Sequence, residues 1–134
     1  MPPYHFTMVG RSFVIPVHPK RTYPYSGGLQ YEGGTTFSLV PDDDWLDSEL
    51  TDLVERILQE GPYRYGDFFN LPMPVYLVRD DETTDVFRVS VRDGSIRFHV
   101  LPETDSPGLQ AMYRRLDERT EDTFHVLREV DESP

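Results

Sequence analysis

Apolar residues recur at every second position along two short stretches near the start of the chain, residues 4–8 and 13–17. A period of two is typical of strands that bury one of their faces. Gly10 lies between the stretches, and glycine supplies the positive φ that a type II′ hairpin turn requires. The pattern therefore predicts an N-terminal hairpin in which Met8 lies opposite Phe13.

Further along, apolar residues recur at the spacing of an α-helix, about 100° per residue. Asp42 to Asp44 can cap the start of this predicted helix, and Gly61-Pro62 marks its end. Trp45, the only tryptophan, lies roughly 140° from the centre of the apolar stripe by helical spacing. It therefore points away from the core by this pattern. The stripe itself consists of Leu46, Leu50, Leu53, Val54, Ile57 and Leu58.

A second helix is predicted to begin at Ser106, because serine is a favoured cap and Pro107 suits the first helical turn. The segment 124–130 that follows it has the composition of a last strand. The apolar stripe of the second helix consists of Leu109, Met112, Tyr113 and Leu116.

Three strands are predicted between the helices, at residues 75–79, 86–91 and 96–101. Asp93-Gly94 separates the last two and is a strong signal for a two-residue turn. These three strands should form an antiparallel meander.

The register of the meander decides which side chains share a face. Pairing Arg92 with Ser95 places the apolar side chains of the last two strands on one face. If the turn before them pairs Val78 with Val86, the apolar residues at 75 and 77 join that face. The helices would then cover it.

The order of these elements, with one more strand at residues 35–40, is typical of an α+β domain. We expect an antiparallel sheet of about five to seven strands, formed by the hairpin and the meander, with both helices on one face. Residues 1–134 should form a single domain. It would contain a long Tyr/Gly/Pro loop at 18–34 and a disordered tail at 131–134.

The formal net charge of −11 argues against a nucleic-acid partner, because binding to phosphates depends on cationic side chains. The lack of cysteine excludes disulfides and thiolate zinc sites. No apolar run approaches the roughly 20 residues of a membrane span, and no signal sequence is visible, so we expect a cytoplasmic protein. The acidity fits either a high-salt habitat or a basic partner.

The loop 23–34 repeats a Tyr-x-Gly-Gly pattern, which raises the question of a phosphate cradle. Such cradles lead into a helix, whereas this loop leads into a predicted strand and has no lysine. Its tyrosines, Tyr23, Tyr25 and Tyr31, combine a large ring with a polar hydroxyl, which suits contacts with a partner. They could equally cover the edge of their own small core.

By these registers, the outward face of the meander carries a polar cluster of Tyr76, Arg88, Arg97 and His99. Arginine forks and a histidine that titrates near neutral pH can hold an anionic group. A polar row is also the ordinary outer side of a half-buried sheet.

Beside this cluster we expect an apolar row of Val78, Val86 and Leu101. An apolar row on an exposed face suggests that the N-terminal hairpin or a second copy of the chain covers it.

No catalytic motif, no metal-ligand spacing and no cofactor signature is visible. We therefore expect a protein that acts by binding, as a homodimer or a protein-interaction module without catalysis. Its interface would include Trp45, Tyr23, Tyr25, Tyr31, Val78, Val86 and Leu101. Two alternatives stay open. One is a pocket on the outer sheet face for an anionic small molecule, as a binding protein or an enzyme. The other is an acidic immunity or adaptor protein for a basic partner.

Overall fold

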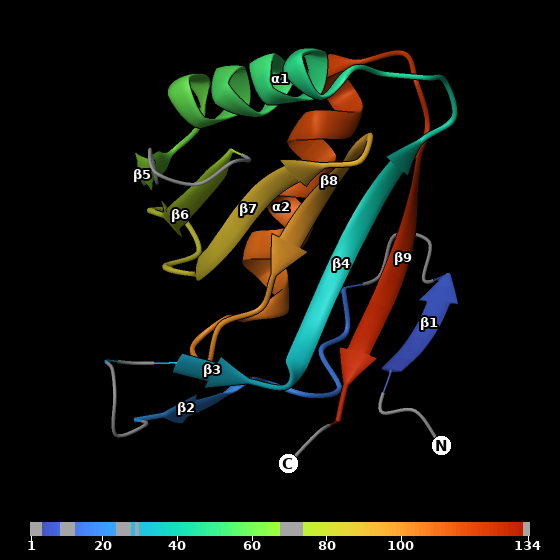
Figure 1. Cartoon of the computed structure of the whole chain (residues 1–134). Coiled ribbons are helices and arrows are strands. Elements are labelled where there is room, and N and C mark those ends of the chain that lie inside the picture. Colours follow the sequence, from blue (N-terminus) through green and yellow to red (C-terminus); the bar gives the residue numbers. More distant parts are fainter. Residues whose placement is uncertain (1–3, 9–12, 24–27, 29, 68–73, 133–134) are drawn as a thin grey trace.

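The computed structural model describes residues 4–8, 13–23, 28, 30–67 and 74–132 (Figure 1). Within them the chain forms nine strands and two helices. These elements are β1 (Tyr4–Met8), β2 (Lys20–Thr22), β3 (Gln30–Glu32), β4 (Gly34–Pro41), α1 (Asp47–Glu60), β5 (Tyr63–Asp67), β6 (Val75–Asp80), β7 (Val86–Arg92), β8 (Ser95–His99), α2 (Ser106–Arg119) and β9 (Phe124–Asp131).

Seven of the strands form one antiparallel sheet in the order β1-β9-β4-β8-β7-β6-β5, and β2 pairs with β3 in a separate small sheet. The predicted α+β class is confirmed. The meander of β6, β7 and β8 is present, and Arg92 lies opposite Ser95 as predicted. Strands β2, β3 and β5 were not predicted from the sequence, which assigned residues 18–34 to a loop.

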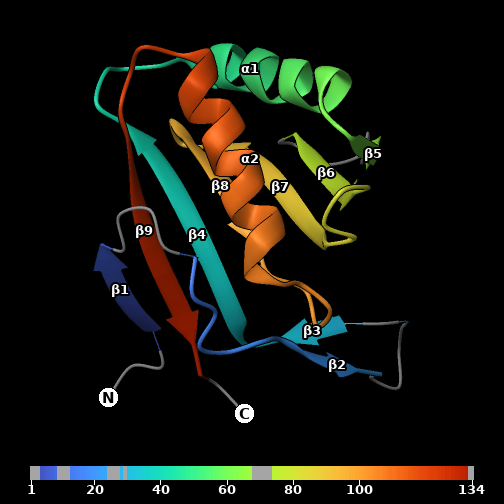
Figure 2. The ribbon, with the colours of Figure 1, turned by 180° about the vertical axis from the view of Figure 1, so that it is seen from behind.

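Both helices pack on the same face of the sheet. Figure 2 shows α2 in front of the sheet, and Figure 1 views the sheet from the opposite side. The core between the layers includes Leu50 and Val54 of α1, Leu109 and Leu116 of α2, and Phe98 of β8, all at most 1% exposed. We call the side away from the helices the outer face.

The starts of both helices differ from the prediction. The N-cap of α2 is Asp105, whose side chain accepts from the N–H of Ser106, so Ser106 is the first helical residue and not the cap. In α1, Leu46 is the N-cap, and its backbone N–H donates to the side chain of Glu49, whereas Asp42 to Asp44 lie in the preceding loop. Leu46 is 67% exposed and does not belong to the apolar stripe. Proximity to the helix start is thus no guarantee of capping, because the cap depends on where the chain turns.

The predicted N-terminal hairpin was wrong. Strand β1 is present, but it pairs with β9, and residues 13–17 form no strand. The turn itself lies outside the described residues. Phe13 instead enters the core beside Phe37 and Tyr113, and its carbonyl accepts a bond of 2.5 Å from Ser106 Oγ at the start of α2. This segment therefore packs on the helix-bearing side of the sheet.

The predicted register of β6 was also wrong, by one residue. Val78 lies opposite Phe87, and Leu77 lies opposite Arg88. Because side chains alternate between faces, this shift moves Tyr76 and Val78 onto the core face and Leu77 onto the outer face.

Within the long connection at 18–34, β2 pairs with β3. Its second glycine pair has positive φ, with Gly33 at 72° and Gly34 at 111°. A Cβ on Gly34 would lie 3.1 Å from Pro19, so glycine allows a close passage of two chain segments here. At the other end of the chain, Asp131 belongs to β9, so the predicted tail does not begin there.

Candidate functional site

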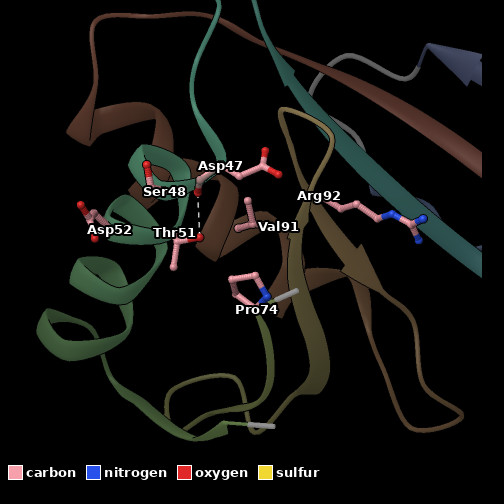
Figure 3. Close-up of a pocket in the computed structure, with 7 residues that line it drawn as sticks. All are labelled: Asp47, Ser48, Thr51, Asp52, Pro74, Val91 and Arg92. Carbon is pink, nitrogen blue, oxygen red and sulfur yellow. Dashed lines mark hydrogen bonds between the residues drawn. The ribbon is translucent and has the colours of Figure 1, made fainter. Parts of the chain in front are cut away.

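A depression of about 560 Å³ lies between the start of α1 and β7 (Figure 3). The Thr51 hydroxyl in its wall already donates to the carbonyl of Asp47, and the Asp47 carboxylate accepts from the N–H of Gly94. Arg92 extends away from the helix in Figure 3. The polar groups of this depression serve local structure and do not converge on one point.

The outer face has an uneven distribution of charge. The outward positions of β5, β6, β7 and β8 follow from the strand registers and hold no carboxylate. They hold five arginines: Arg64, Arg79, Arg88, Arg92 and Arg97. We call these five arginines the arginine half of the outer face. Four of these arginines lie within 4.0 Å of a carboxylate in a neighbouring turn: Arg64 and Arg79 of Asp81, and Arg92 and Arg97 of Asp93.

The opposite side of the outer face is acidic. Strand β9 presents Glu129 and Asp131 there, opposite Thr36 and Gly34 of β4. Positive and negative regions of one face are thus separated by β4, which carries small residues at these positions.

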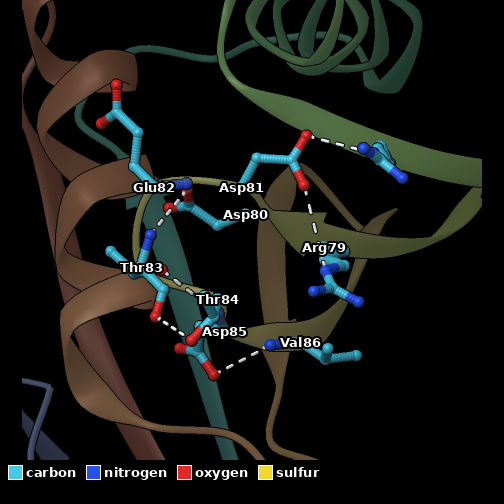
Figure 4. Close-up of polar contacts among 9 residues, drawn as sticks. Arg79, Asp80, Asp81, Glu82, Thr83, Thr84, Asp85 and Val86 are labelled. Carbon is cyan, nitrogen blue, oxygen red and sulfur yellow. Dashed lines mark hydrogen bonds and ion pairs between the residues drawn. The ribbon is translucent and has the colours of Figure 1, made fainter.

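Part of the arginine half is organised by the turn between β6 and β7 (Figure 4). Arg64 and Arg79 lie directly opposite each other, and like charges in such a pair repel. Asp81 relieves the repulsion, because its Oδ2 lies 3.2 Å from Arg64 Nε and its Oδ1 lies 3.9 Å from Arg79 Nε. These pairs are exposed, so they orient the arginines more than they stabilise the fold.

A shallow depression of about 390 Å³ opens between these two arginines. Leu77 and Val86 contribute to its lining, and Leu77 is 41% exposed. The depression therefore has apolar side chains between two basic ones.

His99 lies at the centre of the outer face, beside Arg88 and opposite Thr36. Burial, together with the positive charges of Arg88 and Arg97, lowers the pKa of His99 from 6.5 to about 4. Its Nε2 lies 2.7 Å from the Oγ of Ser90. At neutral pH the ring is therefore uncharged, and the two arginines supply the charge.

Ser90 and His99 are as close to each other as a catalytic nucleophile and its general base, but they share no other property of such a pair. Ser90 is 2% exposed, and a histidine with a pKa near 4 is a weak base at neutral pH. Sequence reasoning did not include Ser90 in the site. Ser90 lies two residues after Arg88, and alternate residues of a strand share a face, so this spacing was a signal that Ser90 lies beside the cluster.

Of the four residues predicted for the polar cluster, the structure brings three together: Arg88, Arg97 and His99. Tyr76 is on the other face, where it is 3% exposed and its hydroxyl donates to Glu55 of α1 at 2.8 Å. The one-residue register shift explains the difference.

The predicted interface residues are dispersed. Val78 is fully buried and Leu101 is 5% exposed, so Val86 alone of that row lies on the outer face. Trp45 packs against the core, and its Nε1 donates to Asp122 at 2.7 Å, which ties the loop before α1 to the turn before β9.

Among the loop tyrosines, Tyr31 has its ring 5.9 Å from the guanidinium carbon of Arg88, within cation–π range. The small β2–β3 sheet thus reaches the edge of the outer face. Tyr23 is 73% exposed, and Tyr25 lies outside the described residues.

Comparison with known proteins gave no match to a protein family, to a curated protein sequence or to a solved structure. In the described part of the chain, neither helix has the length and apolarity needed to cross a bilayer. Functional interpretation therefore depends on the geometry of the outer face.

Proposed function

We propose that this protein acts by binding another protein chain across the outer face of its sheet, without catalysis, and that it does so as a homodimer. The arginine half is the observation that carries the proposal. Five arginines and no carboxylate occupy the outward positions of four neighbouring strands, in a chain with 24 acidic residues. A surface that only keeps the protein in solution does not require its arginines to be separated from its carboxylates in this way.

The shape of the surface favours a protein partner over a small molecule. The depression beside Leu77 is shallow, and its lining does not include Arg97 or His99. Small ligands bind in concave sites that enclose most of their surface, whereas protein interfaces are broad, with an apolar centre and a charged rim.

Leu77 provides the direct test, because it is an exposed leucine on the outer face. We expect the wild-type chain of 15.6 kDa to have twice that mass in light scattering at about 50 µM, with a Kd in the micromolar range. Leu77→Glu should weaken dimerisation at least about tenfold, since it places a charge in an apolar contact.

Leu46→Glu is the matched control, because Leu46 is also exposed but precedes α1, away from the outer face. It should dimerise like the wild type, and both variants should keep the wild-type melting temperature. A monomeric wild type across the micromolar range would refute the homodimer, and equal dimerisation of both variants would refute the use of the outer face.

A second candidate is supported by Arg88 and Arg97, which flank His99 and could hold an anionic small molecule. Thermal-shift measurements with inorganic phosphate, nucleotides and carboxylates test it. A ligand that binds only the folded chain must raise the melting temperature, and Arg97→Ala should abolish the rise. An absence of any shift would count against the pocket. The third alternative, an acidic adaptor for a basic partner, predicts association that weakens as salt is added.

A further inference from the structure

We infer that the two copies meet about a two-fold axis that runs close to the strand direction between β4 and β8. This inference rests on the proposed function, and it adds which residues of the two copies face each other. In a two-fold interface the same surface is used twice, so a contact from one residue to a second is matched by the reverse contact.

The strand registers define a row of outward residues across β6, β7, β8, β4 and β9. Leu77 lies opposite Arg88, and Arg88 opposite His99. His99 lies opposite Thr36, and Thr36 opposite Glu129. Positive and negative charges in this row are therefore three strand positions apart, with two uncharged residues between them at neutral pH.

An axis between β4 and β8 passes through the middle of this row. It exchanges Arg88 with Glu129 and His99 with Thr36. The dimer would therefore contain the Arg88–Glu129 contact twice. Sheets that pack face to face lie about 10 Å apart with strands inclined by roughly 30°, so long side chains such as arginine and glutamate can meet between them.

The neighbouring row is compatible with the same axis. Ser90 lies opposite Arg97, which lies opposite Ser38, which lies opposite Leu127. The axis brings Arg97 to Ser38 and Ser90 to Leu127, so no arginine faces an arginine in either row.

Other positions of the axis are less favourable. An axis centred on β7 would place Arg88 of one copy against Arg88 of the other, and like charges that face each other between desolvated surfaces repel. An axis over β9 would place Glu129 of one copy against Glu129 of the other, which is again a repulsion of like charges. The layout of charge on the outer face therefore favours the axis between β4 and β8.

Charge reversal tests the contact. Arg88→Glu and Glu129→Arg should each weaken dimerisation at least about tenfold, because each dimer loses two attractive pairs and gains two repulsive ones. The double variant Arg88→Glu/Glu129→Arg should restore Kd to within about threefold of wild type. Sedimentation velocity at about 0.15 M salt is the measurement, because the net repulsion between two acidic chains is then screened beyond roughly 8 Å.

The matched control is Arg114→Glu/Glu118→Arg, a reversal of two exposed residues on α2, away from the outer face. This control and its single variants should dimerise like wild type. If the wild type dimerises and the outer-face double variant is no tighter than its single variants, the axis is wrong and the proposed function stands. A monomeric wild type would refute both.

Cross-linking gives a second measurement that does not depend on charge, and the chain has no cysteine of its own to interfere. Equal amounts of Thr36→Cys and His99→Cys chains are mixed and treated with a bismaleimide that spans about 10 Å. The proposed axis predicts covalent dimers that contain one Thr36→Cys chain and one His99→Cys chain. A mixture of Thr36→Cys chains with Gln59→Cys chains, whose cysteine lies on the exposed side of α1, should give no such mixed dimers. Equal cross-linking in both mixtures would overturn the inference.

Discussion

His99 is a histidine that stays neutral because of its surroundings. It lies among other outward side chains of the sheet, contacts Ser90, and has an arginine on either side. Both the burial of the ring and the arginine charges oppose protonation. The pKa of the folded state, about 4, is therefore below the ordinary value of 6.5.

A measurable pH dependence of stability follows. Between pH 6.5 and about pH 4 the unfolded chain binds a proton at this position, and the folded chain does not. The free energy of unfolding should fall as the pH falls through this window, by up to about 3 kcal/mol, and His99→Gln should remove that slope. Urea unfolding at several pH values measures it.

The buried carboxyl of Asp85 has the opposite effect on how stability depends on pH. It must therefore be present in both of the chains that are compared. Burial raises the pKa of this carboxyl, so the stability that protonation of Asp85 confers is lost as the pH rises through that pKa. Both chains contain Asp85, and the difference between their slopes therefore reports His99. Identical slopes for wild type and His99→Gln would contradict the assignment.

The turn between β6 and β7 shows how two elements fix each other. The turn is closed by a bond of 2.8 Å from Asp80 N to Asp85 O, and Asp80 Oδ1 accepts from the N–H of Glu82. Asp85 Oδ1 accepts from the N–H of Asp105 at 2.7 Å, just before α2. The turn is thereby attached to the start of the helix.

Gly108 makes this attachment possible, because a Cβ at that position would overlap the carboxyl group and the Cβ of Asp85. Alanine in a helix interior normally gains about 1 kcal/mol over glycine. Here we expect Gly108→Ala to cost about 2 kcal/mol instead, since overpacking against an atom next to the backbone is not relieved by a rotamer change. Urea unfolding measures this.

Gln110→Ala, on the same helix, is the control and should change stability by less than about 0.5 kcal/mol. A Gly108→Ala variant that is as stable as wild type would show that α2 can move away from the turn at little cost.

At the scale of the whole molecule, the helices and the segment around Phe13 cover one face of the sheet, and no described helix lies over the other (Figures 1 and 2). The uncovered face has the arginine half on one side and Glu129 and Asp131 on the other. The proposed dimer uses this face, and the Leu77 and charge-reversal experiments therefore test the same surface in two ways.

Local patterns in the sequence predict most of the elements and the class of fold. Helical spacing, the Asp93-Gly94 turn and the alternation in β7 and β8 are local signals, because the side-chain period follows from backbone geometry within one element. They identified both helices, the meander and three of the four residues of the polar cluster.

The pairing of the strands and the face that each strand presents depend on contacts between distant segments of the chain. The partner of β1 is β9, more than 100 residues away, and no local pattern specifies so distant a pairing. The register of β6 depends on a turn closed by buried Asp80 and Asp85, and a change of one residue moves Tyr76 from the outer face to the core. The distribution of charge on the outer face depends on this pairing and this register, because it combines arginines of four strands with carboxylates of a fifth.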